Sequence, residues 1–464
     1  MILRIFDQYI PIRKIAFFFL ESVFIMAMVI AAAYLRFLGD TGRLLAYEGL
    51  FLKALLIVAS AQFSLYYFDL YDLKIFRSNL ELAIRLLQSL GVSSLLLAVL
   101  YYLFPFLIIG RGIFLISLGF IGVVIVSWRI IYNHILRTRQ LDQTIMIVGC
   151  GPLAKSVVEE IVEKVDTGFK VAGFISEDPG KTGEEMVNSS ILGDPSRILD
   201  IAKREKVDRI IVALEERRGK IPQAQLLECK MNGIIVEDGI EFYEHLTGKL
   251  QVERLRPSSL IFSEGFRKSK MTMWLKRVSG FSLSLIGLIF LSPLILMISI
   301  LIKIDSPGST FYQQERVGEN RKVFKLLKFR SMVESAEANG PVWAEKNDGR
   351  ITRIGRWIRK WRLDEIPQLV NVLRGDMSFV GPRPERAYFV EKLREEIPFY
   401  DQRFFVKPGL TGLAQVRYQY GSSKEDALEK LRYDLYYIKN LSLLFDLVII
   451  FETIKVVLSG KGAR

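Results

Sequence analysis

The residues best suited to chemistry are two adjacent acids, Asp364 and Glu365, in the stretch RLDEIPQLVNVLRGDMSFVGPRP at 362–384. A Gly-Asp pair and a Pro-Arg-Pro segment around Arg383 follow them. A carboxylate attacks phosphorus and holds the product as an acyl phosphate when cations neutralise the charge of the phosphates. The stretch therefore indicates phosphoryl transfer, although an Asp-Glu pair alone is also typical of a solvated surface.

Basic side chains occur on both sides of the acid pair. Arg359 and Arg362 precede it, Arg383 follows it, and the block KLLKFRSM at 325–332 adds two lysines and an arginine. Guanidinium groups bind phosphate oxygens in a bidentate manner. This pattern predicts a site that neutralises a phosphorylated substrate.

The metal-binding residue types point to a hard cation. Only two histidines, His134 and His245, and two distant cysteines, Cys150 and Cys229, are present. They suggest neither a histidine-based metal site nor a disulfide. Carboxylate and phosphate oxygens favour Mg²⁺ as the metal.

The elements that must position these residues include membrane segments. The chain has 464 residues, of which 50% are hydrophobic, and a mean hydropathy of +0.26. An α-helix needs ~20 residues to cross a hydrocarbon core of ~30 Å. Four apolar segments are long enough, at 15–36, 46–68, 83–109 and 112–134. The first lacks a small-residue cleavage site and is expected to remain as an anchor.

Lysine and arginine in the short loops predict the orientation of these spans. On the side expected to be cytoplasmic are Arg4, Arg13, Lys14, Lys74, Arg77, Arg85, Arg137 and Arg139, whereas the opposite loops carry little beyond Arg43 and Arg111. Everything after residue 140 should then begin in the cytoplasm. Glu21, Glu48 and Lys53 lie in or beside the spans, and their places near the ends favour anchoring or dimer contact over transport.

Residues 141–256 predict a doubly wound α/β domain. Short β-branched runs alternate there with charged helical stretches. The expected strands are 144–148, 171–175, 209–213 and 233–237, and the expected helices are 152–165, 195–206 and 222–232.

A glycine turn follows the first of these strands. Its sequence, GCGPLA, places Gly149 and Gly151 where backbone N–H groups bind a diphosphate in dinucleotide-binding domains. An acid, Glu177 or Asp178, follows the second strand. NAD or another nucleotide is one interpretation, and close packing of strand and helix, which also favours glycine, is the other.

A fifth apolar segment, 278–302, admits two topologies. Basic residues stand on both flanks, so their distribution gives no direction of crossing. Ser292 and Pro293 lie near its middle, and proline kinks a helix because it lacks an N–H and clashes with the preceding turn. We expect a re-entrant helical hairpin that enters and leaves the cytoplasmic leaflet, with an ordinary kinked span as the alternative. The final apolar run, 441–458, is interrupted by charges and predicts an amphipathic helix.

The positive net charge of the chain is consistent with an enzyme that acts at a membrane surface. The formal net charge is +13 and the pI is about 9.5. Such a charge attracts anionic lipid headgroups and diphosphates. Nucleic-acid binding is not expected, because the basic residues cluster beside membrane segments rather than on a recognition helix.

Five ordered blocks resemble one protein family. They are Gln314-x-Arg316-x-Gly318, KFRSM at 328–332, LDEIPQLVNVL at 363–373, RGDMSFVGPRPE at 374–385 and KPGLTGLAQV at 407–416. Together they resemble the bacterial sugar transferases known as polyprenyl-phosphate glycosylphosphotransferases, or monotopic phosphoglycosyl transferases.

The resemblance implies a reaction and a set of residues. Asp364 would attack a UDP-sugar, release UMP and carry the sugar phosphate to polyprenyl phosphate, such as undecaprenyl phosphate. Glu365 would position the acceptor phosphate, and both acids would hold Mg²⁺. The implied phosphate-binding residues are Lys328, Arg359 and Arg383, with Arg330 as a further candidate and Arg417 as a weaker one.

The resemblance also implies an architecture. A four-helix transmembrane bundle (1–140) would precede a Rossmann-like regulatory or structural domain (141–256) and a mainly α catalytic domain (257–464). We expect a homodimer in the bacterial inner membrane, with catalysis on the cytoplasmic face. It would initiate exopolysaccharide or another glycan for downstream glycosyltransferases.

Two other classes of protein remain as alternatives. A nucleotide-sugar dehydratase or reductase would need a second dinucleotide fold and a Tyr-x-x-x-Lys pair, a spacing that Tyr388 and Lys392 have. A non-catalytic scaffold would be expected to lack the acid pair, which is intact.

Overall fold

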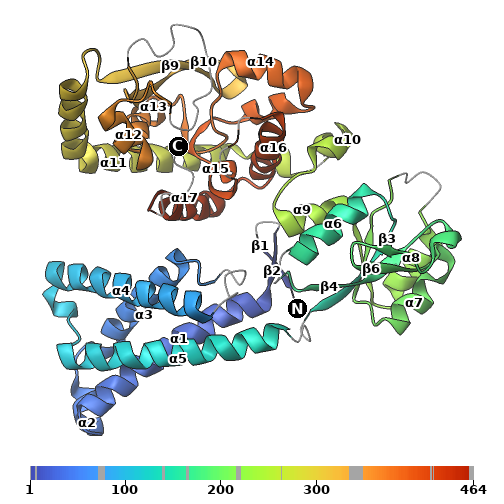
Figure 1. The fold of residues 1–464 in the computed structure, drawn as a ribbon, viewed down its shortest axis with the longest axis horizontal. Helices are drawn as coiled ribbons and strands as arrows, with labels where there is room; N and C mark the ends of the chain where they lie inside the picture. Colours follow the sequence, from blue (N-terminus) through green and yellow to red (C-terminus); the bar gives the residue numbers. More distant parts are fainter. Residues whose placement is uncertain are drawn as a thin grey trace. The chain divides into compact units, whose positions relative to one another are not determined.

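The computed structural model describes residues 2–5, 8–71, 79–137, 142–163, 167–215, 221–255, 257–262, 264–333, 348–418, 421 and 423–458. It divides into two compact units, Met1–Thr247 and Gly248–Arg464 (Figure 1). Lys74, Arg77 and Arg139, which support the predicted orientation, lie outside the described residues.

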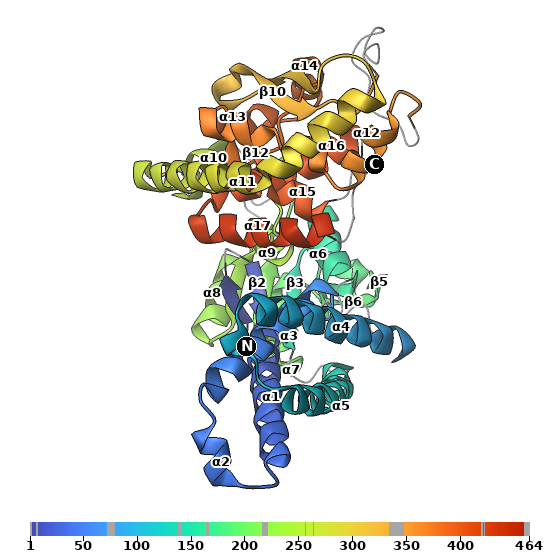
Figure 2. The ribbon, with the colours of Figure 1, turned by 90° about the vertical axis from the view of Figure 1, so that its left-hand side faces the viewer.

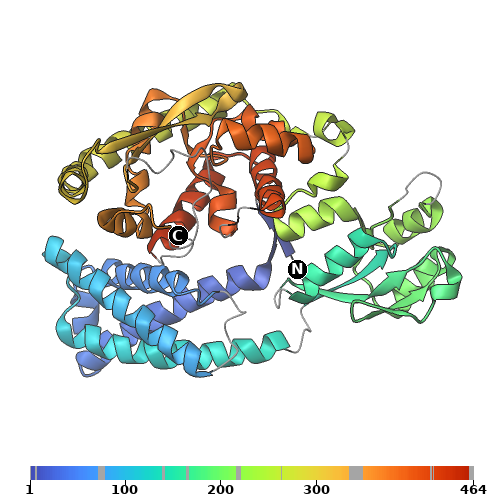
Figure 3. The ribbon, with the colours of Figure 1, turned by 45° about the horizontal axis from the view of Figure 1, so that its top comes forward.

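The four predicted apolar helices of the first unit are confirmed. They are α1 (Ile12–Arg36), α3 (Leu50–Tyr67), α4 (Asn79–Leu103) and α5 (Arg111–Arg137), with a short α2 (Thr41–Ala46) between the first two. All four are long and apolar enough to cross a membrane, and they run side by side (Figures 1 and 3). Helix α4 ends six residues before the expected position 109 because Pro105 disfavours helical backbone at Phe104.

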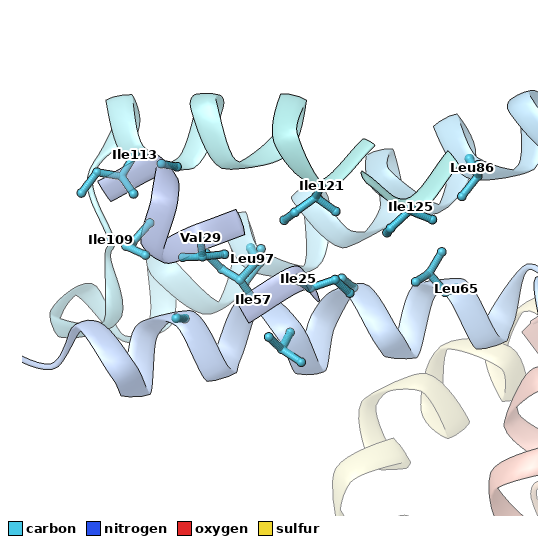
Figure 4. Packing of buried hydrophobic residues seen from close by; sticks show 14 of the residues in the cluster. Ile25, Val29, Ile57, Leu65, Leu86, Leu97, Ile109, Ile113, Ile121 and Ile125 are labelled. Atoms are coloured by element: carbon cyan, nitrogen blue, oxygen red, sulfur yellow. The ribbon is translucent and has the colours of Figure 1, made fainter. Parts of the chain in front are cut away.

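Aliphatic side chains fill the space between these helices. Ile25 and Val29 of α1 point toward Ile57 of α3, Leu97 of α4 and Ile121 of α5 (Figure 4). The opposite faces expose large apolar side chains, as expected for helices whose outer surface meets lipid.

A buried ion pair crosses this bundle. Arg129 on α5 donates to Glu21 on α1 at 2.8 Å, and both side chains are almost completely buried. The hydroxyl of Tyr71 donates to the same carboxylate. Glu21 therefore connects α1 to α5. This role was not apparent from the sequence, because Arg129 lies far from Glu21 along the chain.

The predicted parallel sheet is also confirmed in the first unit. Its order is β5-β6-β4-β3-β7-β8. The strands are β3 (Gln143–Val148), β4 (Phe169–Ile175), β6 (Ser189–Gly193), β7 (Arg209–Val212) and β8 (Ile235–Asp238), with β5 (Glu185–Met186) antiparallel at the edge. The helices are α6 (Pro152–Glu163), α7 (Ile198–Arg204), α8 (Gln223–Met231) and α9 (Gly239–Thr247).

Both faces of this sheet are buried. Ile145 and Ile147 of β3 pack with Phe242 of α9, whereas Met146 and Val148 belong to a second cluster on the other face. Alternate residues of one strand thus enter different cores, which is the pattern of a doubly wound domain.

An N-terminal hairpin attaches α1 to the sheet. Strands β1 (Ile2–Ile5) and β2 (Gln8–Pro11) pair antiparallel, and α1 starts directly after β2. The ring of Tyr9 packs against Phe169 and Phe242, and its hydroxyl donates to Glu237. The hairpin was not predicted.

The first α-helix of the second unit is the short α10 (Pro257–Phe262), and α11 (Lys270–Asp305), a helix of 36 residues, follows it. An antiparallel ribbon of β9 (Phe311–Val317) and β10 (Val323–Phe329) follows, then α12 (Arg353–Lys360), α13 (Gln368–Arg374) and α14 (Ala387–Glu396). Strands β11 (Ser378–Val380) and β12 (Gly409–Thr411) pair in parallel. The last helices are α15 (Leu413–Arg417), α16 (Lys424–Lys439) and α17 (Leu443–Leu458).

Helix α11 consists of two arms that meet at a bend (Figures 1 and 2). Pro293 is the proline inside it. A proline cannot donate to the carbonyl four residues earlier, here that of Ile289. The hydroxyl of Ser292 donates to this carbonyl at 2.8 Å, so the Ser-Pro pair bends the helix and satisfies the oxygen that the bend frees.

Candidate active site

The acid pair lies on one turn of 3₁₀-helix, Leu363–Glu365, between α12 and α13. Arg362 precedes it with a left-handed backbone at φ 54°, which ends the run from α12. Leu363 and Ile366 pack into a cluster with Phe329 and Ile358. The flanking apolar residues thus face inward and leave the two acids on the other side of the turn.

A buried amide fixes α13 against strand β10. Asn371 is fully buried, its Oδ1 accepts from the N–H of Leu327 at 2.9 Å, and its Nδ2 donates to the carbonyl of Lys325 at 2.8 Å. The amide therefore sets the acid-bearing turn relative to the strand that carries Lys328. Sequence reasoning missed this residue, because an asparagine inside an apolar helix gives no sign of its partner.

Glu365 is held by two cations. Arg383 Nη2 lies 2.5 Å from its Oε1, and Lys328 Nζ lies 3.4 Å from the same oxygen. Burial acts to raise the pKa of Glu365, but the positive charges of Arg383 and Lys328 outweigh it and hold that pKa well below its usual range. Glu365 is therefore a carboxylate that is ionised at neutral pH and paired through its Oε1.

Asp364 has a different environment. No hydrogen bond to its carboxylate occurs among the residues that the structure describes. Burial raises its pKa, and the charge of Glu365 adds to this, while Lys328, Arg359 and Arg383 oppose both. Of the two acids, Asp364 is the one whose oxygens remain available for substrate.

The structure brings some predicted phosphate-binding residues to the acids and leaves others elsewhere. Lys328 and Arg383 contact Glu365, and Arg359 acts on Asp364 through its charge. Arg330 donates instead to the carbonyls of Ser306 and Pro307, both at 2.6 Å. It secures the loop after α11.

Arg417 also has its contact away from the acid pair. Its guanidinium pairs with Glu452 on α17 at 2.7 Å, and about half of its side chain is exposed. This pair ties α15 to α17.

The Pro-Arg-Pro segment is fixed through its carbonyl groups. The carbonyl of Pro382 accepts from the N–H of Gly409 at 2.9 Å, and that of Pro384 accepts from Arg316 at 3.1 Å. Gln314 holds the guanidinium of Arg316 through its Oε1 at 2.6 Å. The Gln-x-Arg spacing of β9 is thus explained as a support for the loop that carries Arg383.

The glycine turn of the first unit has a packing role. Gly149 has φ +115°, and a Cβ there would lie 2.7 Å from the carbonyl oxygen of Ala213. A Cβ on Gly151 would lie 2.8 Å from the side chain of Glu215. Backbone atoms therefore require a glycine at 149, whereas at 151 only a flexible side chain lies close, and the carboxylate of that side chain beside the turn is unfavourable for a diphosphate. Nucleotide binding there stays a prediction.

The residues of the dehydratase alternative lie on a surface helix. Tyr388 and Lys392 are on α14, and the Tyr388 side chain is 63% exposed. In the described part of the second unit, each sheet has two strands, so no doubly wound fold there accompanies the pair.

The donor set around the acids fits a magnesium ion held partly by substrate. Among the described residues, no group of three or more His, Cys, Asp or Glu side chains could hold a metal by itself. Mg²⁺ is commonly bound by one or two carboxylates together with phosphate oxygens and water. Asp364 and Glu365, two adjacent carboxylates with positively charged side chains around them, fit that kind of site.

Comparison with known proteins identifies the family. The model of the bacterial sugar transferase family matches residues 271–460, and that of a CoA-binding domain matches residues 66–229. A UDP-N-acetylgalactosamine-undecaprenyl-phosphate N-acetylgalactosaminephosphotransferase from Aeromonas hydrophila is 41% identical over 52% of this chain and 56% of its own length. The chain thus spans little more than half of that relative.

Two other relatives differ in how much of this chain they match. A UDP-glucose:undecaprenyl-phosphate glucose-1-phosphate transferase from Xanthomonas campestris pv. campestris is 33% identical over 71% of this chain and 70% of its own length. The exopolysaccharide production protein PSS of Rhizobium leguminosarum bv. phaseoli is 44% identical over 41% of this chain and 100% of its own length. From this similarity, the chain belongs to the bacterial sugar transferase family.

Proposed function

We propose that this protein transfers a sugar 1-phosphate from a UDP-sugar to a polyprenyl phosphate, such as undecaprenyl phosphate, and releases UMP. The main support for the proposal is the turn that carries Asp364 and Glu365. Three positively charged side chains lie close enough to interact with these two carboxylates, namely Lys328, Arg359 and Arg383. The names of the Aeromonas and Xanthomonas relatives support the substrate classes.

In the first step, the carboxylate of Asp364 attacks the β-phosphorus of the UDP-sugar. The bond between this phosphorus and the bridging oxygen breaks, UMP leaves, and an aspartyl phosphosugar forms. Asp364 needs no external base because it reacts as the carboxylate. Arg383, Lys328 and Arg359 stabilise the negative charge that shifts to the phosphate oxygens.

In the second step, the phosphate of the polyprenyl acceptor attacks the same phosphorus. The acyl phosphate bond breaks, the Asp364 carboxylate is regenerated, and polyprenyl-diphosphate-sugar leaves. Glu365, held ionised by Arg383 and Lys328, keeps these two cations in place during both steps. Mg²⁺, when bound by Asp364 and Glu365, supplies further neutralisation of the diphosphate.

The contacts of α11 support a re-entrant rather than a spanning helix. In the first arm, Arg277 donates to the carbonyl of Leu373 at 2.7 Å, at the end of α13. In the second arm, Ile298 and Ile302 pack against Phe329 of β10 and Ile358 of α12. Both arms therefore pack on the same unit, whereas a spanning helix would carry its ends to opposite sides of ~30 Å of hydrocarbon.

A shallow α11 would hold the acid pair at the height of lipid headgroups on the cytoplasmic face of the bacterial inner membrane. Large apolar side chains such as Ile286, Phe290 and Leu296 are more than half exposed along both arms. The product would remain in that leaflet for glycosyltransferases that extend it, and the similarity to the Rhizobium protein favours an exopolysaccharide. A homodimer stays a prediction.

UMP release by the detergent-solubilised protein tests the proposal. The assay uses a panel that includes UDP-glucose and UDP-N-acetylgalactosamine, with and without undecaprenyl phosphate and Mg²⁺. We expect UMP from at least one donor, in amounts that rise with the lipid and require Mg²⁺. The absence of UMP with every donor would contradict the proposal.

A further inference from the structure

The segment that carries Arg383 is anchored at two further carbonyls by buried polar side chains. Its two prolines, Pro382 and Pro384, have no N–H, so the chain there is held mainly through its oxygens. At the start of the segment, Lys276 donates to the carbonyl of Val380 at 2.7 Å. At Arg383 itself, the carbonyl accepts from Arg403 Nη2 at 3.0 Å.

Arg403 is in turn held by two neighbours. The same Nη2 donates to Asp434 Oδ2 at 2.8 Å, and Nη1 donates to the hydroxyl of Tyr400 at 2.6 Å. Arg403, Asp434 and Tyr400 are all buried. The planar guanidinium can therefore take a single orientation, with one edge toward the carbonyl of Arg383.

Helix α16 supplies both ends of this arrangement. Asp434, which holds Arg403, and Tyr437, whose hydroxyl accepts from Lys276 at 2.6 Å, are three residues apart on α16. Side chains at this spacing lie on one face of a helix. One face of α16 thus fixes the Arg383 segment at two points.

We propose that Arg403, oriented by Asp434, is a positioning residue for Arg383 in the proposed sugar-phosphate transfer. It holds the backbone of Arg383 so that the guanidinium reaches Glu365, at 2.5 Å in the structure. The inference rests on the proposed function, because the cation that Arg403 positions is the one assigned to the phosphates. A displacement of about 1 Å at such a group costs on the order of a hundredfold in rate.

Arg403→Lys tests the proposal, because an ammonium lacks the planar fork that bonds three partners at once. We expect kcat for UMP release to fall at least about tenfold, as for the loss of one charge-assisted hydrogen bond, with a smaller change in KM for the donor.

A double-variant cycle separates positioning from a general structural role. If Arg403 acts through Arg383, then Arg403→Lys made on top of Arg383→Ala should change kcat less than about twofold. Equal losses in both backgrounds would overturn the proposal. Arg394→Lys, in an exposed ion pair of α14, is the control for arginine-to-lysine exchange and should leave kcat unchanged.

Two further measurements test the proposal if the Arg403→Lys variant does not fold or if the proposed function is wrong. If Arg403→Lys does not fold, Asp434→Asn removes the charge that orients Arg403 and should give the same losses. If wild-type protein releases UMP from no donor, the proposed function fails, and an experimental structure of either variant decides the positioning. An Arg383 guanidinium moved away from Glu365 supports it, and an unmoved one overturns it.

Discussion

At the scale of single residues, two adjacent acids have opposite electrostatic environments. Glu365 is paired with Arg383 and Lys328, whereas Asp364 is partly buried and has no hydrogen bond from the described residues. The paired acid is suited to holding cations in place, and the other is suited to attack. This difference gives a physical reason for the choice of nucleophile, which in the sequence depends on family resemblance alone.

The pH dependence of UMP release should report the raised pKa of Asp364. A raised pKa means that Asp364 protonates at a higher pH than an ordinary aspartate, so activity is present above this pKa and is lost as the pH falls through it. Arg359→Gln removes a charge that lowers this pKa and should move the acid limb of kcat to higher pH. Arg356→Gln, on the exposed side of the same helix, is the matched control and should leave the limb in place.

Replacement of Arg383 by lysine should impair catalysis although the charge is kept. A lysine lacks the fork that bonds Glu365 and a phosphate together, and the loss of a charge-assisted hydrogen bond predicts a decrease in kcat/KM of roughly tenfold to a hundredfold. Steady-state kinetics of Arg383→Lys measures it. Wild-type kinetics in this variant would remove Arg383 from the site.

The sequence predicts the charged residues of the site better than it predicts their supports. Lys328 and Arg383 contact Glu365, but Arg330 has its contacts in the loop after α11 and Arg417 on α17. Asn371 is not apparent from the sequence, because its amide bonds the backbone of a strand about 45 residues earlier. A contact between distant segments has no local signal.

At the scale of elements, the long apolar helices and the buried parallel strands were predictable, since hydrophobic runs and their period depend on local sequence. The hairpin of β1 and β2 was not predicted. Its position depends on Tyr9, which packs against Phe169 and Phe242, more than 150 residues away. Strands β5 and β6 have only two and five residues and were also missed.

Cysteine accessibility tests the re-entrant geometry of α11. Lys270→Cys and Lys303→Cys place thiols at exposed positions near the two ends of the helix. In a background without Cys150 and Cys229, a membrane-impermeant reagent should label both positions in inside-out vesicles and neither in right-side-out vesicles. Labelling of the two ends from opposite sides would establish a spanning helix.

The buried pair of Arg129 and Glu21 should behave differently when broken and when removed. Arg129→Met leaves a buried carboxylate without its cation, a change that costs ~3–5 kcal/mol in unfolding free energy. Arg129→Met combined with Glu21→Leu removes both charges and should restore most of that loss. Thermal unfolding in detergent compares the single and the double variant. Equal destabilisation of the two variants would show that the packing of these side chains, and not their charges, stabilises the helices.

At the scale of the whole molecule, the proposed chemistry lies in one of the two units. The sugar transferase model covers residues 271–460, within the unit Gly248–Arg464, and the entire Rhizobium relative aligns with 41% of this chain. We therefore expect a fragment of residues 248–464, purified in detergent, to release UMP with the same donor preference. An inactive but folded fragment would show that the first unit takes part in catalysis.

The covalent intermediate is the central claim, and intact-protein mass spectrometry tests it most directly. Protein mixed with its UDP-sugar and Mg²⁺, without polyprenyl phosphate, should gain the mass of one sugar phosphate. Digestion of this protein should then place the added mass on the peptide that contains Asp364. Addition of polyprenyl phosphate should remove it, and Asp364→Asn should never acquire it. Turnover without this adduct, or an adduct that persists in Asp364→Asn, would contradict the account.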